Sequence, residues 1–173
     1  MRKLLFAWLT IGLAGAAMAA STITGNVTGP GGGALENIQV SAYRYNGNWY
    51  DWENSALTGP SGGYSIPDLP AGTYRVEFSD NAGVYATEWY NNTLDRSDAE
   101  ELVVGESATV PGINAQLVEA TRITGRVTNG AGQPLEDITA WVSLWTGASW
   151  LDLFGMGTDT NGDYEITGIP AGT

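Results

Sequence analysis

The chain has 173 residues, of which 43% are hydrophobic, and it contains neither Cys nor His. It therefore lacks disulfides, a thiol nucleophile, an imidazole base and any metal site built from Cys or His, which leaves carboxylate chemistry or plain binding. The formal net charge of −12 excludes a nucleic-acid partner, because basic residues must replace the counterions of the phosphates.

Residues 1–19 have the organisation of a secretory signal peptide. Arg2 and Lys3 precede an apolar run at 4–14, and Ala17-Met18-Ala19 fits the small-residue cleavage pattern. The run is shorter than the roughly 20 residues that a membrane span needs, and no second apolar span follows. We therefore expect an exported protein, secreted or at the cell surface, with no membrane span after cleavage.

The remaining sequence predicts an all-β fold. Short alternating runs, separated by clusters of Gly, Pro, Asn and Asp, are typical of half-buried strands, and we expect such strands at 22–28, 38–45, 49–57, 64–66, 74–79 and 108–117. Asn46-Gly47 is a hairpin signal, and only 95–102 has a composition that favours a helical turn. Six or seven strands in about 100 residues predict an Ig-like or transthyretin-like antiparallel β-sandwich.

An internal repeat with an offset of 100 residues organises the chain. Ile23-Thr24-Gly25 recurs at 123–125, and 18 of the 51 positions at 23–73 are identical to those at 123–173. Because so long a period suits tandem domains, we expect one sandwich at 20–119 and a second, truncated copy at 120–173. The second copy stops before the strand expected at 74–79 in the first, so we expect a fragment of a longer protein. The alternative is an open edge that accepts a partner's strand.

Four motifs of the repeat resemble those of the carboxypeptidase regulatory-like domains. They are Ile-Thr-Gly-x-Val-Thr, Gly-x-Pro-Leu-Glu-Asp-Ile at 132–138, Thr-Asp-x-Asn-Gly-Asp-Tyr at 158–164 and Gly-Ile-Pro-Ala-Gly-Thr at 168–173. The family is grouped with Cna-B-like, prealbumin-like and starch-binding-like modules of exported bacterial proteins. The resemblance implies a β-sandwich that serves as a non-catalytic appendage of peptidases, glycosidases or surface proteins. The Lys–Asn cross-link of many Cna-B modules cannot form, because no Lys follows Lys3.

Aromatic side chains are the candidate ligand-binding residues. Alternation turns the aromatic residues of 38–45 and 138–145 outward. A three-residue turn at 46–48 predicts that Trp49, Asp51 and Glu53 lie on that same face, and a two-residue turn at 146–147 predicts Trp150 outward, with Leu151 and Leu153 inward. A second candidate is the loop at 88–92. The candidates are Tyr43, Tyr45, Trp49, Trp89, Tyr90, Trp141, Trp145 and Trp150.

These aromatic residues have two interpretations. Rings beside carboxylates suit sugar binding, because the rings can stack on the sugar and the carboxylates can accept hydrogen bonds from its hydroxyl groups. Alternatively, the rings pair across strands beneath a neighbouring domain or the 80–100 loop, and Trp89 and Tyr90 anchor that loop. The acceptors at 159–165 suggest calcium, but Gly162 precedes Asp163 where a calcium loop needs Gly after its third ligand. We therefore expect a β-turn, with no metal and no cofactor.

The sequence favours a non-catalytic structural or interaction module of an exported, bacterial protein. No spacing singles out a pair of carboxylates for glycoside hydrolysis. The alternative functions are a carbohydrate-binding accessory module of a secreted polysaccharide hydrolase, such as an amylase-like enzyme, or a regulatory module of a peptidase. The expected partner is accordingly a polysaccharide or another protein at the cell surface.

Overall fold

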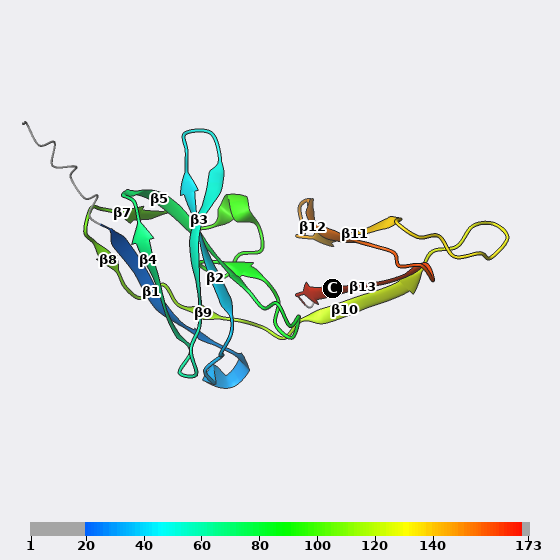
Figure 1. Ribbon diagram of the computed structural model, residues 1–173, viewed down its shortest axis with the longest axis horizontal. Helices are drawn as coiled ribbons and strands as arrows, with labels where there is room; N and C mark the ends of the chain where they lie inside the picture. The colour runs from blue at the N-terminus through cyan, green and yellow to red at the C-terminus, as the bar shows by residue number, and fades with distance from the viewer. Residues whose placement is uncertain (1–19, 171–173) are drawn as a thin grey trace, which may run out of the picture.

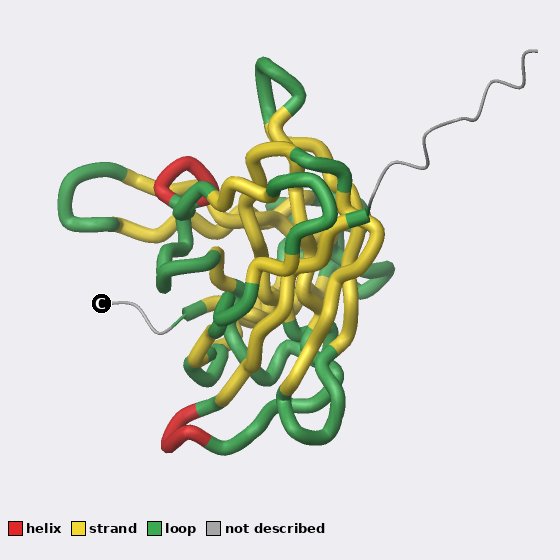
Figure 2. Tube along the Cα trace, turned by 90° about the vertical axis from the view of Figure 1, so that its left-hand side faces the viewer, coloured by secondary structure: helices red, strands yellow, loops and turns green. Residues whose placement is uncertain are grey.

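The computed structural model describes residues 20–170, which are almost entirely β-structure (Figure 1). The predicted signal peptide lies outside the described residues. The only helical elements in the described part are two single-turn 3-10 helices, η1 (Pro30–Gly32) and η2 (Arg96–Asp98), at the periphery of the strands (Figure 2). The strands are β1 (Ser21–Thr28), β2 (Gln39–Tyr45), β3 (Tyr50–Leu57), β4 (Gly63–Leu69), β5 (Gly72–Ser79), β6 (Glu88–Trp89), β7 (Leu102–Val104), β8 (Thr109–Val110), β9 (Ala115–Gln116), β10 (Thr121–Arg126), β11 (Thr139–Trp145), β12 (Trp150–Gly157) and β13 (Asp163–Ile169).

The first nine strands form a sandwich of two sheets. One sheet has the order β4-β1-β8, with β9 also beside β1, and the other has the order β3-β2-β5-β6, with β7 also beside β5. Neighbouring strands are antiparallel except where β8 and β9 run parallel to β1. The predicted β-sandwich fold is therefore confirmed. The strand expected at 108–117 is broken into β8 and β9, because the chain turns between them at Gly112, whose φ is 80°.

The core of this sandwich lies between its two sheets. Alternate side chains of each strand point inward, and the strands β1, β2, β4 and β5 contribute Ile23, Val27, Val40, Ala42, Ile66, Leu69, Tyr74, Val76 and Phe78, all fully buried. Burying a large apolar side chain contributes roughly 1.5–3 kcal/mol. A slip of one residue would turn these side chains outward, so the core fixes which residues lie on the outer faces.

A long connection at 80–101 runs from β5 to β7 and carries β6 and η2. Its first turn is closed by the Asp80 carboxylate, which accepts hydrogen bonds from the backbone N–H groups of Ala82 and Val84 at 2.9 Å each. At η2, the Asp95 carboxylate accepts from the Ser97 N–H at 2.7 Å. This short 3-10 turn lies within the stretch where the sequence favours a helical turn.

Strands β10 to β13 repeat the pairing of β1 to β4 at an offset of 100 residues. Ile23 pairs with Ile66 and Ile123 with Ile166, while Ala42 pairs with Asn54 and Val142 with Phe154. The register shifts at the same positions in both halves. We call β10–β13 the C-terminal half-sandwich; it lies to one side of the first sandwich, beyond the short link that follows β9 (Figure 1).

No helix within residues 20–170 has the length and apolar character of a membrane span.

Candidate functional site

The outer face of β2 and β3 carries a row of aromatic rings. Tyr45 pairs with Tyr50 across the two strands, and Tyr43 pairs with Trp52. The rings of Tyr45 and Tyr50 lie 5.2 Å apart, a separation that favours aromatic pairing. Trp52 is 56% exposed, so this row includes a large ring that the solvent reaches.

The prediction that Trp49, Asp51 and Glu53 lie beside Tyr43 and Tyr45 was wrong. The loop between the strands has four residues, 46–49, and not three, so Tyr50 takes the place expected for Trp49. The Asn46 side chain stabilises this longer loop, because its Oδ1 accepts hydrogen bonds from the N–H groups of Asn48 and Trp49 at 2.9 and 3.1 Å. Trp49 instead lies at the tip of the hairpin.

Asp51 and Glu53 do not lie beside Tyr43 and Tyr45, for two related reasons. Asp51 pairs with Arg44 and therefore shares the face opposite Tyr43 and Tyr45. The register then shifts between Ala42 and Tyr43, which leaves Glu53 as the extra residue of a β-bulge. The sequence signal for the true register is the alternation that places Tyr50 and Trp52 on one face of β3. The repeat has Trp150 and Asp152 at the corresponding positions.

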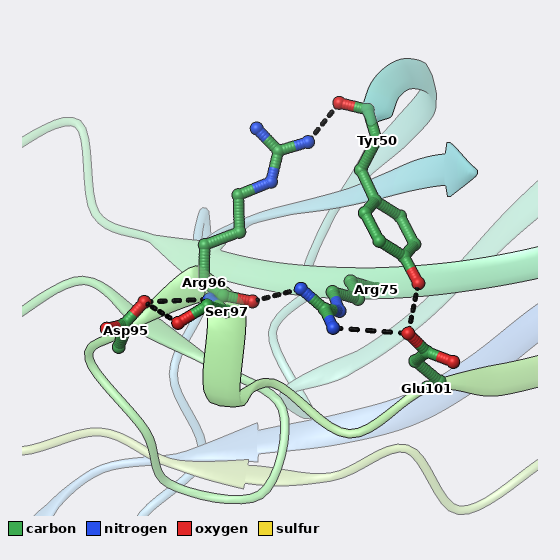
Figure 3. Close-up of polar contacts among 6 residues, drawn as sticks. All are labelled: Tyr50, Arg75, Asp95, Arg96, Ser97 and Glu101. Atoms are coloured by element: carbon green, nitrogen blue, oxygen red, sulfur yellow. Dashed lines mark hydrogen bonds and ion pairs between the residues drawn. The ribbon is translucent and has the colours of Figure 1, made fainter. Parts of the chain in front are cut away.

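Two arginine side chains lie against rings of this aromatic row, and both are close to Tyr50 (Figure 3). The Arg96 guanidinium lies 4.8 Å from the ring centre of Tyr43 and 5.4 Å from that of Trp89, and Arg75 lies 4.4 Å from that of Tyr50. Arg96 also donates to the carbonyl oxygen of Tyr50. These contacts are within the range of cation–π interactions. We call Arg75 and Arg96 the arginine pin.

The arginine pin joins the long connection to the sheet. Arg75 on β5 donates to the carbonyl oxygen of Arg96 at 2.7 Å and to the Glu101 carboxylate at 3.1 Å. Tyr50 donates its hydroxyl group to the same Glu101 oxygen at 2.5 Å. The segment 96–101 is therefore held against β3 and β5 by charged hydrogen bonds, which are stronger than neutral ones.

Tyr43 is held in its neutral form beneath this segment. Its hydroxyl group donates to Glu77 at 3.0 Å. Burial, followed by the negative charge of Glu77, raises the pKa of Tyr43 to about 12. Burial likewise raises the pKa of Glu77. The pair is a structural hydrogen bond across β2 and β5, and it leaves Tyr43 only partly accessible.

In the second candidate group, Trp89 is buried and Tyr90 is half-buried. Trp89 is only 7% exposed and its ring centre lies 5.2 Å from that of Tyr43. Tyr90 packs against the sandwich core, and its N–H donates to the carbonyl oxygen of Val76 at 2.8 Å. In this arrangement both residues attach the long connection to the sheet.

The hairpin of β11 and β12 carries the second exposed aromatic group. Trp145 pairs with Trp150 and their ring centres lie 5.4 Å apart. Trp141 and Trp150 are 70% and 68% exposed. The loop again has four residues, 146–149, so the predicted two-residue turn was wrong, although Trp150 does lie outward beside Trp145. Leu151 pairs with Leu144 on the opposite face, while Leu153 is the extra residue at the register shift.

An open groove of about 490 Å³ lies where the first sandwich meets β12. Its walls combine apolar groups with carboxylates and one guanidinium; they include Glu77, Trp89, Asp95, Arg96, Asp152 and Phe154. Such a lining can contact the apolar face of a small molecule and also hydrogen-bond its polar groups.

The carboxylates of the acidic turn at 159–165 accept hydrogen bonds from other groups of the same chain. Asp159 accepts hydrogen bonds from the N–H groups of Asn161 and Asp163 at 2.8 and 2.9 Å. Arg126 donates to both oxygens of Asp163, at 2.6 and 2.8 Å, and lowers the pKa of that carboxyl group. Within residues 20–170, no cluster of three acidic side chains has a metal-binding arrangement.

Residues 22–105 match the family model of the carboxypeptidase regulatory-like domain. The match covers slightly less than half of the chain. The resemblance that the sequence motifs indicated is thus confirmed. The matched range of the regulatory-like domain runs from β1 to just beyond β7, so it includes the β2–β3 hairpin and the arginine pin. Strands β8 and β9 lie outside it but complete the same sandwich.

The solved structures that are similar to this chain include two pilins and the TIE protein of Bacillus anthracis. A streptococcal ancillary pilin is 12% identical, with a TM-score of 0.39, and the match covers 88% of this chain and 51% of the pilin. The Bacillus anthracis TIE protein is 14% identical, with a TM-score of 0.41, over 86% of this chain and 26% of that protein. The minor pilin GBS52 of Streptococcus agalactiae is 15% identical, with a TM-score of 0.40, over 59% and 45% of the two chains.

The chain thus spans about half or less of each of these three structures. A search of curated proteins finds no match to the sequence.

Proposed function

We propose that the chain is a non-catalytic interaction module of an exported protein, and that it binds its partner through the exposed aromatic side chains of its two hairpins. We call this set the aromatic hairpin surface; it consists of Tyr45, Trp49, Trp52, Trp141, Trp145 and Trp150. The exposure of these rings is the observation that carries the proposal.

Exposed indole rings are unusual on a monomeric surface, because large aromatic side chains are normally mostly buried. Aromatic residues are instead enriched in the centres of protein interfaces, where truncation of a Trp or Tyr costs the most affinity. The corresponding positions Tyr45 and Trp145 both carry rings, as do Tyr50 and Trp150. This correspondence favours a shared role for the two hairpins.

The proposed export rests on the organisation of residues 1–19, and the proposed division into units at 20–119 and 120–173 on the repeated register of β1–β4 and β10–β13. The non-catalytic role is supported by the carboxylates of β3 and of the segment between η2 and β7. Glu101 is bound to Arg75, and Glu53 lies 3.8 Å from Arg44. These carboxylates form ion pairs instead of a facing catalytic pair.

The test is binding of the fluorescently labelled chain to cell envelopes of the producing organism. We expect saturable binding that weakens at least tenfold in the W49A/W52A and W145A/W150A variants, because each removes two exposed rings. The control is Val103→Ser, which changes an exposed apolar residue on β7. Equal binding by all three variants and the unaltered chain would contradict the proposal.

Carbohydrate binding is a second candidate, supported by the groove beside β12. Its Phe154 ring can pack on a sugar, while Asp152 and Arg96 can bind hydroxyl groups. Titration with soluble starch and chitin oligosaccharides tests this candidate. We expect an Asp152→Ala variant to bind more weakly than the unaltered chain, and an absence of binding by the unaltered chain would reject the candidate.

A further inference from the structure

The loop at 46–49 carries an Asn-Gly pair at the end of the protruding β2–β3 hairpin (Figure 1). An asparagine before a glycine can lose ammonia, because the glycine nitrogen can attack the side-chain amide carbon and no Cβ atom of the glycine obstructs the approach. The chain has three such pairs, which begin at Asn46, Asn129 and Asn161. All three asparagines are exposed, but the groups that surround them differ.

The side-chain oxygen of Asn46 already has two backbone donors. Its Oδ1 accepts hydrogen bonds from the N–H groups of Asn48 and Trp49 at 2.9 and 3.1 Å. Attack on the amide carbon places a negative charge on this same oxygen. Enzymes lower the barrier to acyl transfer by directing backbone N–H groups at such an oxyanion. The loop therefore stabilises the intermediate that ammonia loss requires.

The side-chain nitrogen of Asn46, which leaves as ammonia, faces a carboxylate. Its Nδ2 donates a hydrogen bond to Asp51 at 2.7 Å. As the carbon–nitrogen bond breaks, the leaving nitrogen takes up a proton, and the Asp51 carboxylate can stabilise the positive charge that develops. The attacking nitrogen is also available: within residues 20–170, the Gly47 N–H donates to no backbone carbonyl group.

The other two Asn-Gly pairs lack part of this arrangement. The Gly162 N–H donates to the carbonyl oxygen of Asp159 at 2.8 Å, so the nitrogen that follows Asn161 is occupied. Asn129 has two backbone donors on its oxygen, but its side-chain nitrogen donates to the neutral amide of Gln133 at 3.2 Å. Among the three pairs, the one at Asn46 alone combines all three features.

We propose that Asn46 is a site of self-modification, where the hairpin converts its Asn-Gly pair into a succinimide and then into Asp or isoAsp. The Gly47 nitrogen loses its proton to solvent and bonds to Cγ of Asn46, the bond from Cγ to Nδ2 breaks, and ammonia leaves with the added proton. Water then opens the ring. Attack at Cγ gives Asp, and attack at the main-chain carbonyl carbon gives isoAsp. The net change is the loss of ammonia and the gain of water.

Both products alter the loop that positions Trp49. IsoAsp lengthens the main chain by one methylene group, which changes the geometry of the loop. Asp replaces the donor that faces Asp51 by a second carboxylate, and like charges so close together repel each other. The modification should therefore weaken partner binding with time. This consequence rests on the proposed function, because Trp49 belongs to the aromatic hairpin surface.

The second hairpin provides a matched control. Thr146 takes the place of Asn46 in a loop of the same length, and its hydroxyl oxygen accepts a hydrogen bond from the Ser149 N–H at 3.2 Å. An Asn46→Thr variant should therefore keep the loop, although it has no amide to lose. Asp51→Asn keeps the shape of that side chain and removes its charge.

The test is incubation of the purified chain at neutral pH in water enriched in oxygen-18, followed by cleavage after arginine and mass spectrometry. Each conversion during the incubation adds one heavy oxygen, and fragmentation of the peptides separates isoAsp from Asp. We expect Asn46 to convert at least tenfold faster than Asn161, and faster than Asn129. Conversion of Asn46 should slow at least threefold in Asp51→Asn, and Asn46→Thr should gain no heavy oxygen at that position.

Two results would overturn the inference. The first is conversion of Asn46 no faster than that of Asn161, and the second is equal conversion in Asp51→Asn and the unaltered chain. Neither measurement needs a partner, so both are independent of the proposed function. The effect on the partner is measured separately, by envelope binding of fresh and incubated chains. The incubated chain should bind more weakly, and Asn46→Thr should not change; equal binding by a fully converted chain would contradict this consequence.

Discussion

Arg96 is the residue that most clearly links the long connection to the aromatic row. Its guanidinium faces three rings, those of Tyr43, Tyr50 and Trp89, with the Tyr50 ring centre at 5.9 Å. The planar guanidinium group can stack on rings and donate a hydrogen bond to a carbonyl group at the same time, whereas the ammonium group of a lysine cannot. Arg96 thereby holds the segment around η2 over Trp89 and keeps that ring away from solvent.

Replacing Arg96 by Ala is expected to destabilise this segment and loosen it from the sheet. Partly desolvated cation–π contacts and a charged hydrogen bond together contribute on the order of 1–3 kcal/mol. We expect the free energy of unfolding in urea to fall by about that amount, and cleavage by a non-specific protease to begin within 91–101. Arg96→Lys should recover less than half of the loss. An Arg96→Ala variant with unaltered stability and protease resistance would show that the pin is dispensable.

Glu88 gives the fold a pH dependence. It is 8% exposed and lies opposite Phe78, on the core side of the sheet. Burial raises its pKa from 4.5 to about 7. The folded state therefore binds the proton more tightly than the unfolded state, and Glu88 lowers the stability as the pH rises from about 4.5 through 7.

The variant Glu88→Gln removes this titration. We expect it to be more stable than the unaltered chain at pH 8, by on the order of 1–3 kcal/mol, and equally stable at pH 4, where both side chains are neutral. Chemical unfolding at the two pH values measures the difference, and Glu36→Gln, at an exposed site, serves as the control. A difference that does not change with pH would contradict the assignment.

At the scale of the elements, β1 depends on the close passage of the chain at 111–114, because a Cβ atom at Gly25 would overlap the carbonyl group of Ile113. We expect Gly25→Ala to cost more than 3 kcal/mol or to prevent folding, because backbone of the neighbouring segment would have to move. Gly125→Ala meets only the Tyr164 side chain, which can rotate, and should cost less. Gly33→Ala, whose added Cβ contacts nothing, is the control. Equal thermal stability of the Gly25 and Gly33 variants would contradict this role of β1.

The strands with strong apolar alternation could be predicted from the sequence, because the core itself fixes them. Val40 and Ala42 point inward in β2, and Tyr74, Val76 and Phe78 in β5, as their spacing requires. The register of β3 could not be predicted in this way. It depends on the Asn46 side chain, which lengthens the loop, and on the bulge at Glu53, which changes the face after Trp52.

The residue types of the candidate site could be predicted from the sequence better than the solvent exposure of each side chain. Trp145 and Trp150 lie on the same outward face because they pair with each other across the β11–β12 hairpin. Trp89 is covered by Arg96, which lies seven residues later in the chain. The local sequence pattern at 88–92 does not predict that contact. The strands β6 and β7 have only two and three residues, which is too short for a periodic signal.

At the scale of the whole molecule, the aromatic rings divide into a covered group and an exposed group. Trp89 and Tyr90 bind the long connection to the sandwich, whereas the six rings of the aromatic hairpin surface have large solvent-exposed areas. The formal net charge of −12 opposes non-specific association. A partner that covers the hairpins should therefore be recognised by the rings.

Hydroxyl-radical footprinting of the free chain and of the chain bound to cell envelopes tests this claim most directly. The account predicts that Trp49, Trp52, Trp141, Trp145 and Trp150 are oxidised in the free chain and protected at least severalfold in the bound chain. Trp89 should be oxidised little in either state, and Val103 equally in both. Protection confined to residues outside the two hairpins, with the five tryptophans still oxidised, would contradict the account.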